Sequence, residues 1–256
     1  MKTHIVLVHG ACHQAWHLHL LAQTLDAAGY TTSTPQLPSA ALDPTGPSCT
    51  LAGDTAVITA ALEAAAATSD AILPVFHSYA GVPGSEAVAA LSNSAKAKIP
   101  RLVYLAAFVL EPGTNVLAAD GGDGSESSSW IGRQGDCTLP VPDPIATFYH
   151  DVEPALAAQA VKHLVKQAYE PMAAKATQAG WKLFPVTYVF CAEDRAVPAE
   201  CMRARVETIL GDERLRGRWE VLTLEGGHSP FLSRPDECAR VIRRAAGEDV
   251  GVDGWR

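Results

Sequence analysis

A serine, an aspartate and a histidine each stand at the end of an apolar run in this chain. Ser78 ends the run AILPVFHS at 71–78, Asp194 ends VTYVFCAED at 186–194, and His228 directly follows WEVLTLEGG at 219–227. A serine hydroxyl is a poor nucleophile until a base takes its proton, and a carboxylate can orient that base and stabilise its charged form. The pattern predicts catalysis with Ser78 as nucleophile, His228 as general base and Asp194 as orienting acid.

The surroundings of Ser78 predict a tight turn from a buried strand into a helix. Such a turn exposes the serine oxygen at the carboxyl edge of a sheet and aims the positive end of the helix at the substrate. The usual pattern is G-x-S-x-G, and here Ala80 meets the second small position while Phe76 violates the first. Taken alone, Ser78 is also compatible with an ordinary helix N-cap.

The remaining acids and histidines are weaker candidates. Glu193 and Glu111 are alternative orienting acids, and a solvated loop carboxylate is the plain interpretation of each. His77 adjoins Ser78, but we expect it to point to the opposite side of the strand, which makes it a poor base. Five further histidines have no comparable placement and are expected to be structural: His13, His17, His19, His150 and His163.

The run VLVHGACHQAW at 6–16 offers backbone donors for a developing negative charge. A strand is expected to end at His9 and Gly10, beyond which the amides have no strand partner. The N–H groups of Ala11 and Tyr79 are the predicted oxyanion hole, each worth on the order of 100- to 1,000-fold in rate. Alone this signal is weak, because many strand-to-helix turns use glycine.

Six apolar runs predict the strands that position these residues. Most are continuous rather than alternating, as expected for strands covered on both faces of a parallel sheet. Helical patterns alternate with them; one has Leu18, Leu21 and Leu25 on one face and Gly29 at its end, and another has Val57, Ala60 and Ala64 on one stripe. The alternation predicts an α/β fold with a doubly wound, mostly parallel sheet. The runs are 4–10, 31–38, 71–78, 101–109, 186–194 and 219–227, and the helical stretches are 17–29, 51–67, 79–91, 199–211 and 233–247.

One segment breaks the alternation and predicts an inserted cap. Residues 1–109 and 182–256 form the expected core, and residues 110–181 form the cap, or lid. Its first part is rich in Gly, Ser and Asp and predicts a loop, for which disorder without a role is the alternative. Its second part, EPALAAQAVKHLVKQAYEPM, places Ala157, Val161, Leu164 and Ala168 on one amphipathic stripe and predicts helices.

Composition excludes several classes of partner. The 256 residues are 48% hydrophobic and 19% charged, which is ordinary for a globular protein. The net charge of −8 argues against nucleic acid and anionic membranes as partners, and no apolar run is long enough to span a bilayer. The oligomeric state stays open, a homodimer included.

The six cysteines are widely and irregularly spaced, and MKTHIVLVHG begins as a strand rather than as a secretory signal. We therefore expect free thiols and a cytoplasmic protein. Neither C-x-x-C nor H-E-x-x-H occurs, so no metal site is expected.

The sequence resembles the α/β-hydrolase superfamily along nearly its whole length. HIVLVHGACHQAW, LLAQTLDAAGY, HSYAG and RLVYLAAFV are similar to one branch, the plant methylesterases and hydroxynitrile lyases with their microbial relatives. In that branch the lyases carry a threonine where Gly10 stands and a lysine where Ser229 stands, so the resemblance points to a hydrolase. The cap is the least similar part.

The resemblance implies carboxylester hydrolysis without a cofactor. It assigns Ser78, Asp194 and His228 to the triad and the amides of Ala11 and Tyr79 to the oxyanion hole. The expected substrate is a small-molecule ester, lactone or thioester of a small to medium apolar acid. Other reactions stay open on the same triad: a lyase, a C–C bond hydrolase, a cyclase, or a receptor that only binds its ligand. Candidates for an apolar wall, with plain core packing as the alternative, are Phe108, Trp130 and Phe148.

Overall fold

The computed structural model describes residues 2–119, 132–134, 137–139, 141–197 and 199–251. Its centre is a six-stranded sheet in the order β10-β9-β5-β4-β1-β2, and every neighbouring pair is parallel. All six apolar runs predicted as strands are strands of this sheet. Their bounds are β1 Thr3–Val8, β2 Thr31–Ser33, β4 Ala71–His77, β5 Leu102–Leu105, β9 Val186–Cys191 and β10 Trp219–Leu224.

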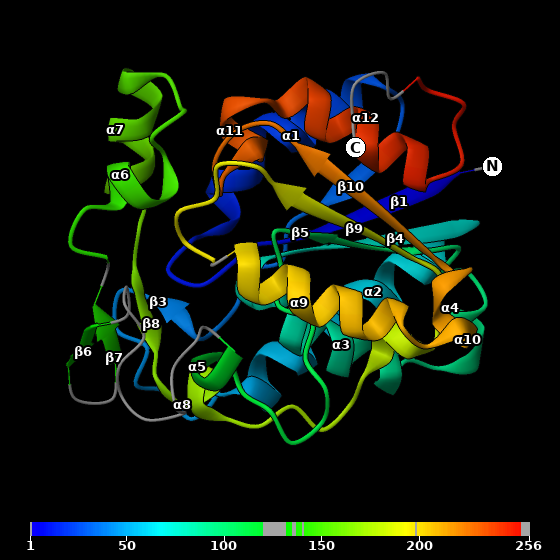
Figure 1. Cartoon of the computed structure of the whole chain (residues 1–256), viewed down its shortest axis with the longest axis horizontal. Helices are drawn as coiled ribbons and strands as arrows, with labels where there is room; N and C mark the ends of the chain where they lie inside the picture. Colours follow the sequence, from blue (N-terminus) through cyan, green and yellow to red (C-terminus); the bar gives the residue numbers. More distant parts are fainter. Residues whose placement is uncertain (1, 120–131, 135–136, 140, 198, 252–256) are drawn as a thin grey trace.

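Helices cover both faces of the sheet, as the alternating pattern predicted. α1 and α12 lie on one face, and α2, α3 and α9 lie on the other (Figure 1). All seven residues of β4 are buried, because both of its faces are covered. The helices are α1 His19–Ala27, α2 Leu51–Thr68, α3 Gly81–Ala90, α9 Ala199–Leu210 and α12 Pro235–Ala245, with the short α4 Asn93–Lys96, α10 Glu213–Arg216, α11 Pro230–Ser233, η1 Ala15–Leu18 and η3 Gly180–Lys182.

Two helical faces test the sequence pattern. Leu18, Leu21 and Leu25 are buried as expected, and Gly29 ends that segment at a φ of 91°. The stripe expected in α2 does not face the core, since Ala60 and Ala64 are exposed. The buried residues of α2 are Leu51, Asp54, Ile58, Leu62, Ala65 and Ala66.

The predicted cap contains strands as well as helices. Its second part contains the helix α7, which ends at Lys162, then the strand β8, then the short helix α8; helices were expected there, but the strand was not. β8 lies in a second, antiparallel sheet of order β3-β8-β7-β6, in which β3 comes from the core. These elements are α5 Val116–Ala119, β6 Gly132–Gln134, β7 Cys137–Leu139, α6 Pro144–Phe148, α7 Pro154–Lys162, β8 Lys166–Ala168, α8 Glu170–Ala173 and β3 Ala40–Ala41.

The cap lies beyond the carboxyl end of the large sheet. The arrowheads of β9 and β10 point toward the side of the molecule that carries α6, α7 and the small sheet (Figure 1). Because all six strands are parallel, the segments that follow each of them meet at this edge. The residues predicted to do chemistry belong to those segments.

Candidate active site

Ser78 lies on a strained turn between β4 and α3. Its φ is 54°, a left-handed value that is unusual for a residue other than glycine. One turn of 3-10 helix, η2 Ser78–Ala80, follows it, and α3 begins at Gly81. The Phe108 N–H donates to the Ser78 carbonyl at 3.1 Å, and a methyl group on Gly81 would lie 2.2 Å from the Phe108 carbonyl oxygen. The turn predicted from the sequence is therefore present and is held by the segment after β5.

Backbone strain gathers at this edge of the sheet. In the described part of the chain, three residues other than glycine have a positive φ: Cys12 at 62°, Ser78 at 54° and Ala106 at 45°. They follow β1, β4 and β5, which are neighbours in the sheet. Strained backbone is concentrated at functional sites, because the surrounding structure must hold it in place.

His228 and Asp194 form a buried pair. His228 Nδ1 lies 2.8 Å from Asp194 Oδ2, and the two side chains are 2% and 4% exposed. Asp194 Oδ1 accepts from the N–H groups of Ala196 and Val197 at 2.8 and 3.0 Å. Because the backbone fixes the carboxylate, the imidazole has one orientation, with Nδ1 donating and Nε2 left for another partner.

The alternative acids have other positions. The Glu193 side chain is on an exposed residue, and its backbone carbonyl accepts from His150 Nε2 at 3.0 Å. Glu111 pairs with Lys182 at 2.7 Å on the surface. Of the three carboxylates considered, Asp194 is the one that binds His228.

His77 packs against the predicted base, and its expected role as a poor base is unchanged. Its ring centroid is 4.6 Å from that of His228, and its Nε2 donates to the His228 carbonyl at 3.0 Å. Burial lowers the pKa of His77 well below its usual value. The contact places the His228 loop directly beside the strand end that carries Ser78. The hydrogen bonds of the described chain do not include one between the Ser78 hydroxyl and His228, and transfer of a proton between them stays a prediction.

Two histidines expected to be structural, His13 and His17, are buried beside His77. The ring centroid of His13 lies 4.6 Å from that of His17 and 5.7 Å from that of His77. His13 Nδ1 donates to the Ala11 carbonyl at 2.8 Å, and the Tyr149 hydroxyl donates to His13 Nε2 at 3.0 Å. Each nitrogen thus has the partner that a neutral ring needs. Burial, with the neighbouring histidines, lowers the pKa of His13 well below its usual value.

The predicted oxyanion donors lie after β1 and β4, which are adjacent strands. A methyl group on Gly10 would lie 2.7 Å from Ser78 Cβ and 2.9 Å from His77 Nδ1. The segment before Ala11 therefore touches the turn that carries Tyr79, and only glycine permits that approach. The role of the two amides stays a prediction.

The three aromatic candidates differ in placement. The Phe148 ring is buried, and its centroid lies 5.7 Å from that of His228 and 5.1 Å from that of His13. Phe108 is fully buried, and its backbone binds the Ser78 turn. Trp130 lies outside the described residues. Contact with a substrate stays a prediction for all three.

The sequence pattern predicted no role at the site for His150 and Asp151, yet they bind the loops that carry the predicted acid and base. Besides the bond from His150 to Glu193, Asp151 Oδ2 accepts from the Gly227 N–H at 2.8 Å. A methyl group on Gly226, whose φ is 103°, would lie 2.5 Å from Asp151 Oδ2. The absence of side chains at Gly226 and Gly227 lets Asp151 of the predicted cap approach the His228 loop.

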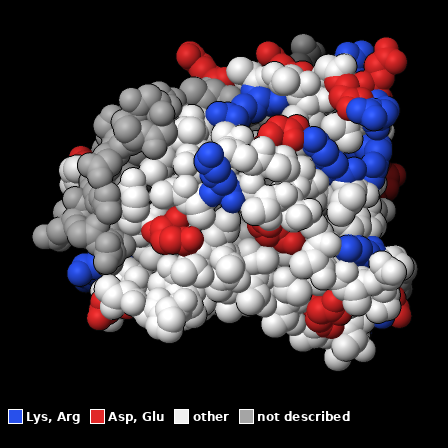
Figure 2. Space-filling view, turned by 90° about the horizontal axis from the view of Figure 1, so that it is seen from below, with Lys and Arg blue, Asp and Glu red and all other residues white. Residues whose placement is uncertain are grey.

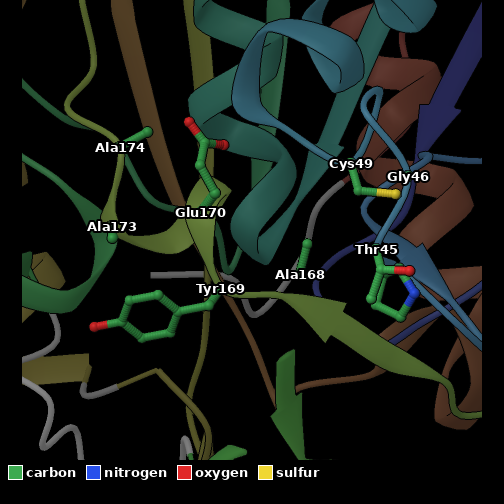
Figure 3. A pocket seen from close by; sticks show the side chains of 9 residues that line it. Thr45, Gly46, Cys49, Ala168, Tyr169, Glu170, Ala173 and Ala174 are labelled. Carbon is green, nitrogen blue, oxygen red and sulfur yellow. The ribbon is translucent and has the colours of Figure 1, made fainter. Parts of the chain in front are cut away.

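A cavity of about 520 Å³ opens where the cap meets the core. Thr45, Gly46 and Cys49 lie on one side, and Tyr169 and Ala173 lie on the other (Figure 3). None of its lining residues belongs to the predicted triad. Ala168 also lines this cavity, and its neighbour Gln167 is buried.

Other classes of site find no support within the described ranges. They contain no cluster of three or more His, Cys, Asp or Glu side chains placed to hold a metal ion. Cys49, Cys191 and Cys238 are thiols rather than members of a disulfide. None of the described helices combines the length and hydrophobicity needed to cross a membrane. On the face seen from below, acidic and basic side chains are scattered among uncharged ones (Figure 2).

The fold and site together define an α/β hydrolase. Residues 5–241 match the model of the α/β hydrolase family, so the chain belongs to that family. The α/β hydrolase nvfD of Aspergillus novofumigatus is 29% identical over 257 residues, which cover 98% of this chain and all of that protein. A probable hydrolase, R7 of a Phoma species, is 29% identical over 90% of both chains.

Solved structures share the fold at low sequence identity. Polyneuridine aldehyde esterase is 19% identical over 96% of this chain and 100% of its own, with a TM-score of 0.74. A pyrethroid hydrolase from Sphingobium faniae is 18% identical over 96% of this chain and 98% of its own, with a TM-score of 0.71. These two neighbours establish the architecture of the chain, not its substrate.

Proposed function

We propose that this hydrolase cleaves a carboxylic ester, lactone or thioester of a small to medium apolar acid through an acyl-enzyme. The observation that carries the proposal is the buried pair of His228 and Asp194, placed beside the strained turn of Ser78. The strain at Ser78 supports a nucleophile. A plain helix N-cap is disfavoured because the N-cap positions of η2 and α3 are held by His77 and Ala80. The structural similarity to polyneuridine aldehyde esterase and to a pyrethroid hydrolase points in the same direction.

In the proposed reaction, Ser78 Oγ attacks the substrate carbonyl carbon while His228 Nε2 takes the hydroxyl proton. The carbonyl oxygen becomes an oxyanion that accepts from the amides of Ala11 and Tyr79. His228 then gives its proton to the leaving alcohol or thiol, and an acyl group stays on Ser78. Water, deprotonated by His228, repeats the sequence and releases the acid. Asp194 keeps Nδ1 protonated throughout.

Gly10 and Ser229 support a hydrolase over a lyase. A larger residue at position 10 would press on Ser78, as the 2.7 Å approach to its Cβ indicates. Ser229 is fully buried and uncharged, where the lyases of the similar branch carry a lysine. No charged amine is therefore available next to His228 from this position.

A panel of chromogenic esters, lactones and thioesters tests the proposal, run on the wild type and on Ser78→Ala. The wild type should show a burst of alcohol or thiol, and a fluorophosphonate should label Ser78. Ser78→Ala should lose activity by roughly 10⁵- to 10⁶-fold. Full esterase activity in Ser78→Ala, or labelling at another serine only, would reject this function.

A further inference from the structure

A chain of buried hydrogen bonds connects the segment after β1 with the residue after the nucleophile. The Cys12 N–H donates to Gln167 Oε1 at 3.3 Å, and Gln167 Nε2 donates to Ser39 Oγ at 2.7 Å. The Ser39 hydroxyl donates to Asp54 Oδ2 at 2.5 Å, and the Tyr79 hydroxyl donates to the same oxygen at 2.6 Å. The chain therefore begins next to Ala11 and ends at Tyr79, the two residues whose amides we assign to the oxyanion hole.

The network is buried and its donors and acceptors are consistent. Ser39, Asp54, Tyr79, Gln167 and Cys12 are each at most 2% exposed. Asp54 accepts from two hydroxyls and from the Ser39 N–H at 3.1 Å, as an ionised carboxylate does. Burial raises the pKa of Asp54, and the bonds from Ser39 and Tyr79 act against that rise. Burying a carboxylate is unfavourable unless hydrogen bonds compensate for the lost water. A fully hydrogen-bonded buried network makes the surrounding structure rigid.

Both ends of the network meet constrained backbone. Cys12 has a φ of 62°, and its carbonyl also accepts from the Val165 N–H at 2.9 Å. At the other end, Tyr79 directly follows the strained Ser78, and its ring is fully buried. Fixing the Cys12 peptide and the Tyr79 hydroxyl fixes the backbone segments to which the two amides belong.

We infer that Asp54, Ser39 and Gln167 are positioning residues that align the Ala11 and Tyr79 amides toward one oxyanion. The inference rests on the proposed function and adds residues from three separate segments to its machinery. Oxyanion donors act because they are fixed before charge develops, and a displacement of 1 Å can cost about 100-fold in rate. Since Gln167 and Val165 belong to the cap, seating of β8 completes the oxyanion hole.

The test compares Asp54→Asn, Ser39→Ala, Gln167→Leu and Tyr79→Phe on the ester that the wild type cleaves best. Each should lower kcat about 10- to 100-fold and leave KM near the wild-type value, because the substrate carbonyl is uncharged before attack. A trifluoromethyl ketone supplies the second readout. Ser78 Oγ adds to its carbonyl carbon, the hydroxyl proton passes to His228, and the carbonyl oxygen becomes the oxyanion. Its affinity should fall by the same factor as kcat.

Glu86→Gln is the matched control. Glu86 is a buried carboxylate of α3 that also accepts from a hydroxyl and from backbone amides, those of Thr177 and Gln178. This variant should lose stability but keep kcat and inhibitor affinity. Asp54→Asn combined with Gln167→Leu should cost little more than either change alone, because both interrupt one chain.

The outcomes separate the inference from the function on which it rests. Folded Asp54→Asn and Tyr79→Phe proteins with wild-type kcat would overturn the inference, as would an equal loss of kcat in Glu86→Gln. If another variant does not fold, Ser39→Ala still tests the inference through its kcat, because it removes only the hydroxyl that connects Gln167 with Asp54. A wild type that cleaves no member of the panel and takes no fluorophosphonate would overturn the function itself.

Discussion

The Phe76 ring fills the space that a side chain at Gly84 would otherwise occupy. A methyl group on Gly84 would lie 2.5 Å from Phe76 Cδ1. The same ring packs edge-on against Tyr104 at 5.5 Å, its partner in β5. The large Phe76 side chain, which departs from the usual nucleophile pattern, is therefore accommodated against α3 at Gly84, about one turn after the helix begins. The strained turn at Ser78 forms without a small residue at position 76.

We predict that Gly84→Ala destabilises the protein. In an open helix interior this change stabilises by about 0.5–1 kcal/mol, but overpacking a core costs about 1–3 kcal/mol. The second effect is larger here, so the free energy of unfolding should fall by about 1 kcal/mol or more. Urea denaturation measures it.

Gly217→Ala is the control for Gly84→Ala, because a methyl group there meets no atom within 4 Å. It should leave the urea midpoint unchanged or raise it. Phe76→Leu should relieve part of the effect of Gly84→Ala in the double variant, since the two side chains compete for one space. Strictly additive changes in the free energy of unfolding would contradict the shared space.

The sheet was predictable because strands that are buried on both faces have continuous apolar sequences. The β4 sequence is apolar from Ala71 to Phe76, and the neighbouring strands β1 and β5 carry similar runs. The cap was less predictable, because short antiparallel strands such as β8 have three residues and pair with distant segments. A pattern with helical spacing at 154–168 could not reveal that Lys166 starts a strand. Tertiary pairing with Ala40–Ala41 decided that segment.

The placement of Ser78, Asp194 and His228 at one edge of the sheet was predictable, because each follows a strand. The residues that support these three were not. Asp54 was missed because the stripe of α2 singled out from the sequence, with Ala60 and Ala64, is not the buried one. The spacing of Asp54, Ile58 and Leu62 puts a carboxylate on the buried stripe, and that spacing was the available signal. Gln167 and Asp151 left no such signal, because their partners at Cys12 and Gly227 are 155 and 76 positions away in the sequence.

We predict that Asp194→Asn lowers kcat by roughly 10³- to 10⁴-fold with little change in KM, by analogy with other triads. The asparagine carbonyl can still accept from Ala196 and Val197, so its amide group turns toward His228 Nδ1. The imidazole then carries its proton on Nε2 and cannot accept one from Ser78. Steady-state kinetics measure the loss. Glu193→Gln, one residue earlier and exposed, should keep wild-type kcat; an equal loss in both would reject the assigned acid.

We predict that Asp151→Ala lowers kcat about tenfold while the protein stays folded. The change removes the acceptor of the Gly227 N–H and so loosens the loop that carries His228. Esterase assays beside thermal melts measure it. Asp143→Asn is the control, because the Asp143 carboxylate lies in the same inserted segment and accepts from the Ala146 N–H as the N-cap of α6. It should not change kcat, and a normal kcat in Asp151→Ala would contradict the coupling of cap and base.

We predict that stability falls as the pH is lowered from 7.5 to 5, because several histidines are buried as neutral rings. Burial lowers the pKa of His9 and of His17 to about 4, and it lowers the pKa of His13 and of His77 well below the usual 6.5. Below pH 6.5 the unfolded chain takes up protons that the folded chain refuses. Each such histidine then destabilises the fold by about 1.4 kcal/mol per pH unit. Asp54, whose pKa is raised by burial, acts in the opposite direction but is a single group.

Thermal unfolding at pH 7.5 and pH 5 measures this dependence. His9 and His17 alone should lower the melting temperature by roughly 10 °C at pH 5. His17→Gln is the matched variant. Its amide can donate to the Ala160 carbonyl and accept from the Gln14 N–H, as His17 does. The melting temperature of this variant should fall less between pH 7.5 and pH 5, because unfolding takes up one proton fewer. The contribution of the other buried histidines should not change. Equal melting temperatures of the wild type at both pH values, or an unchanged slope in His17→Gln, would show that these rings do not stay neutral in the folded chain.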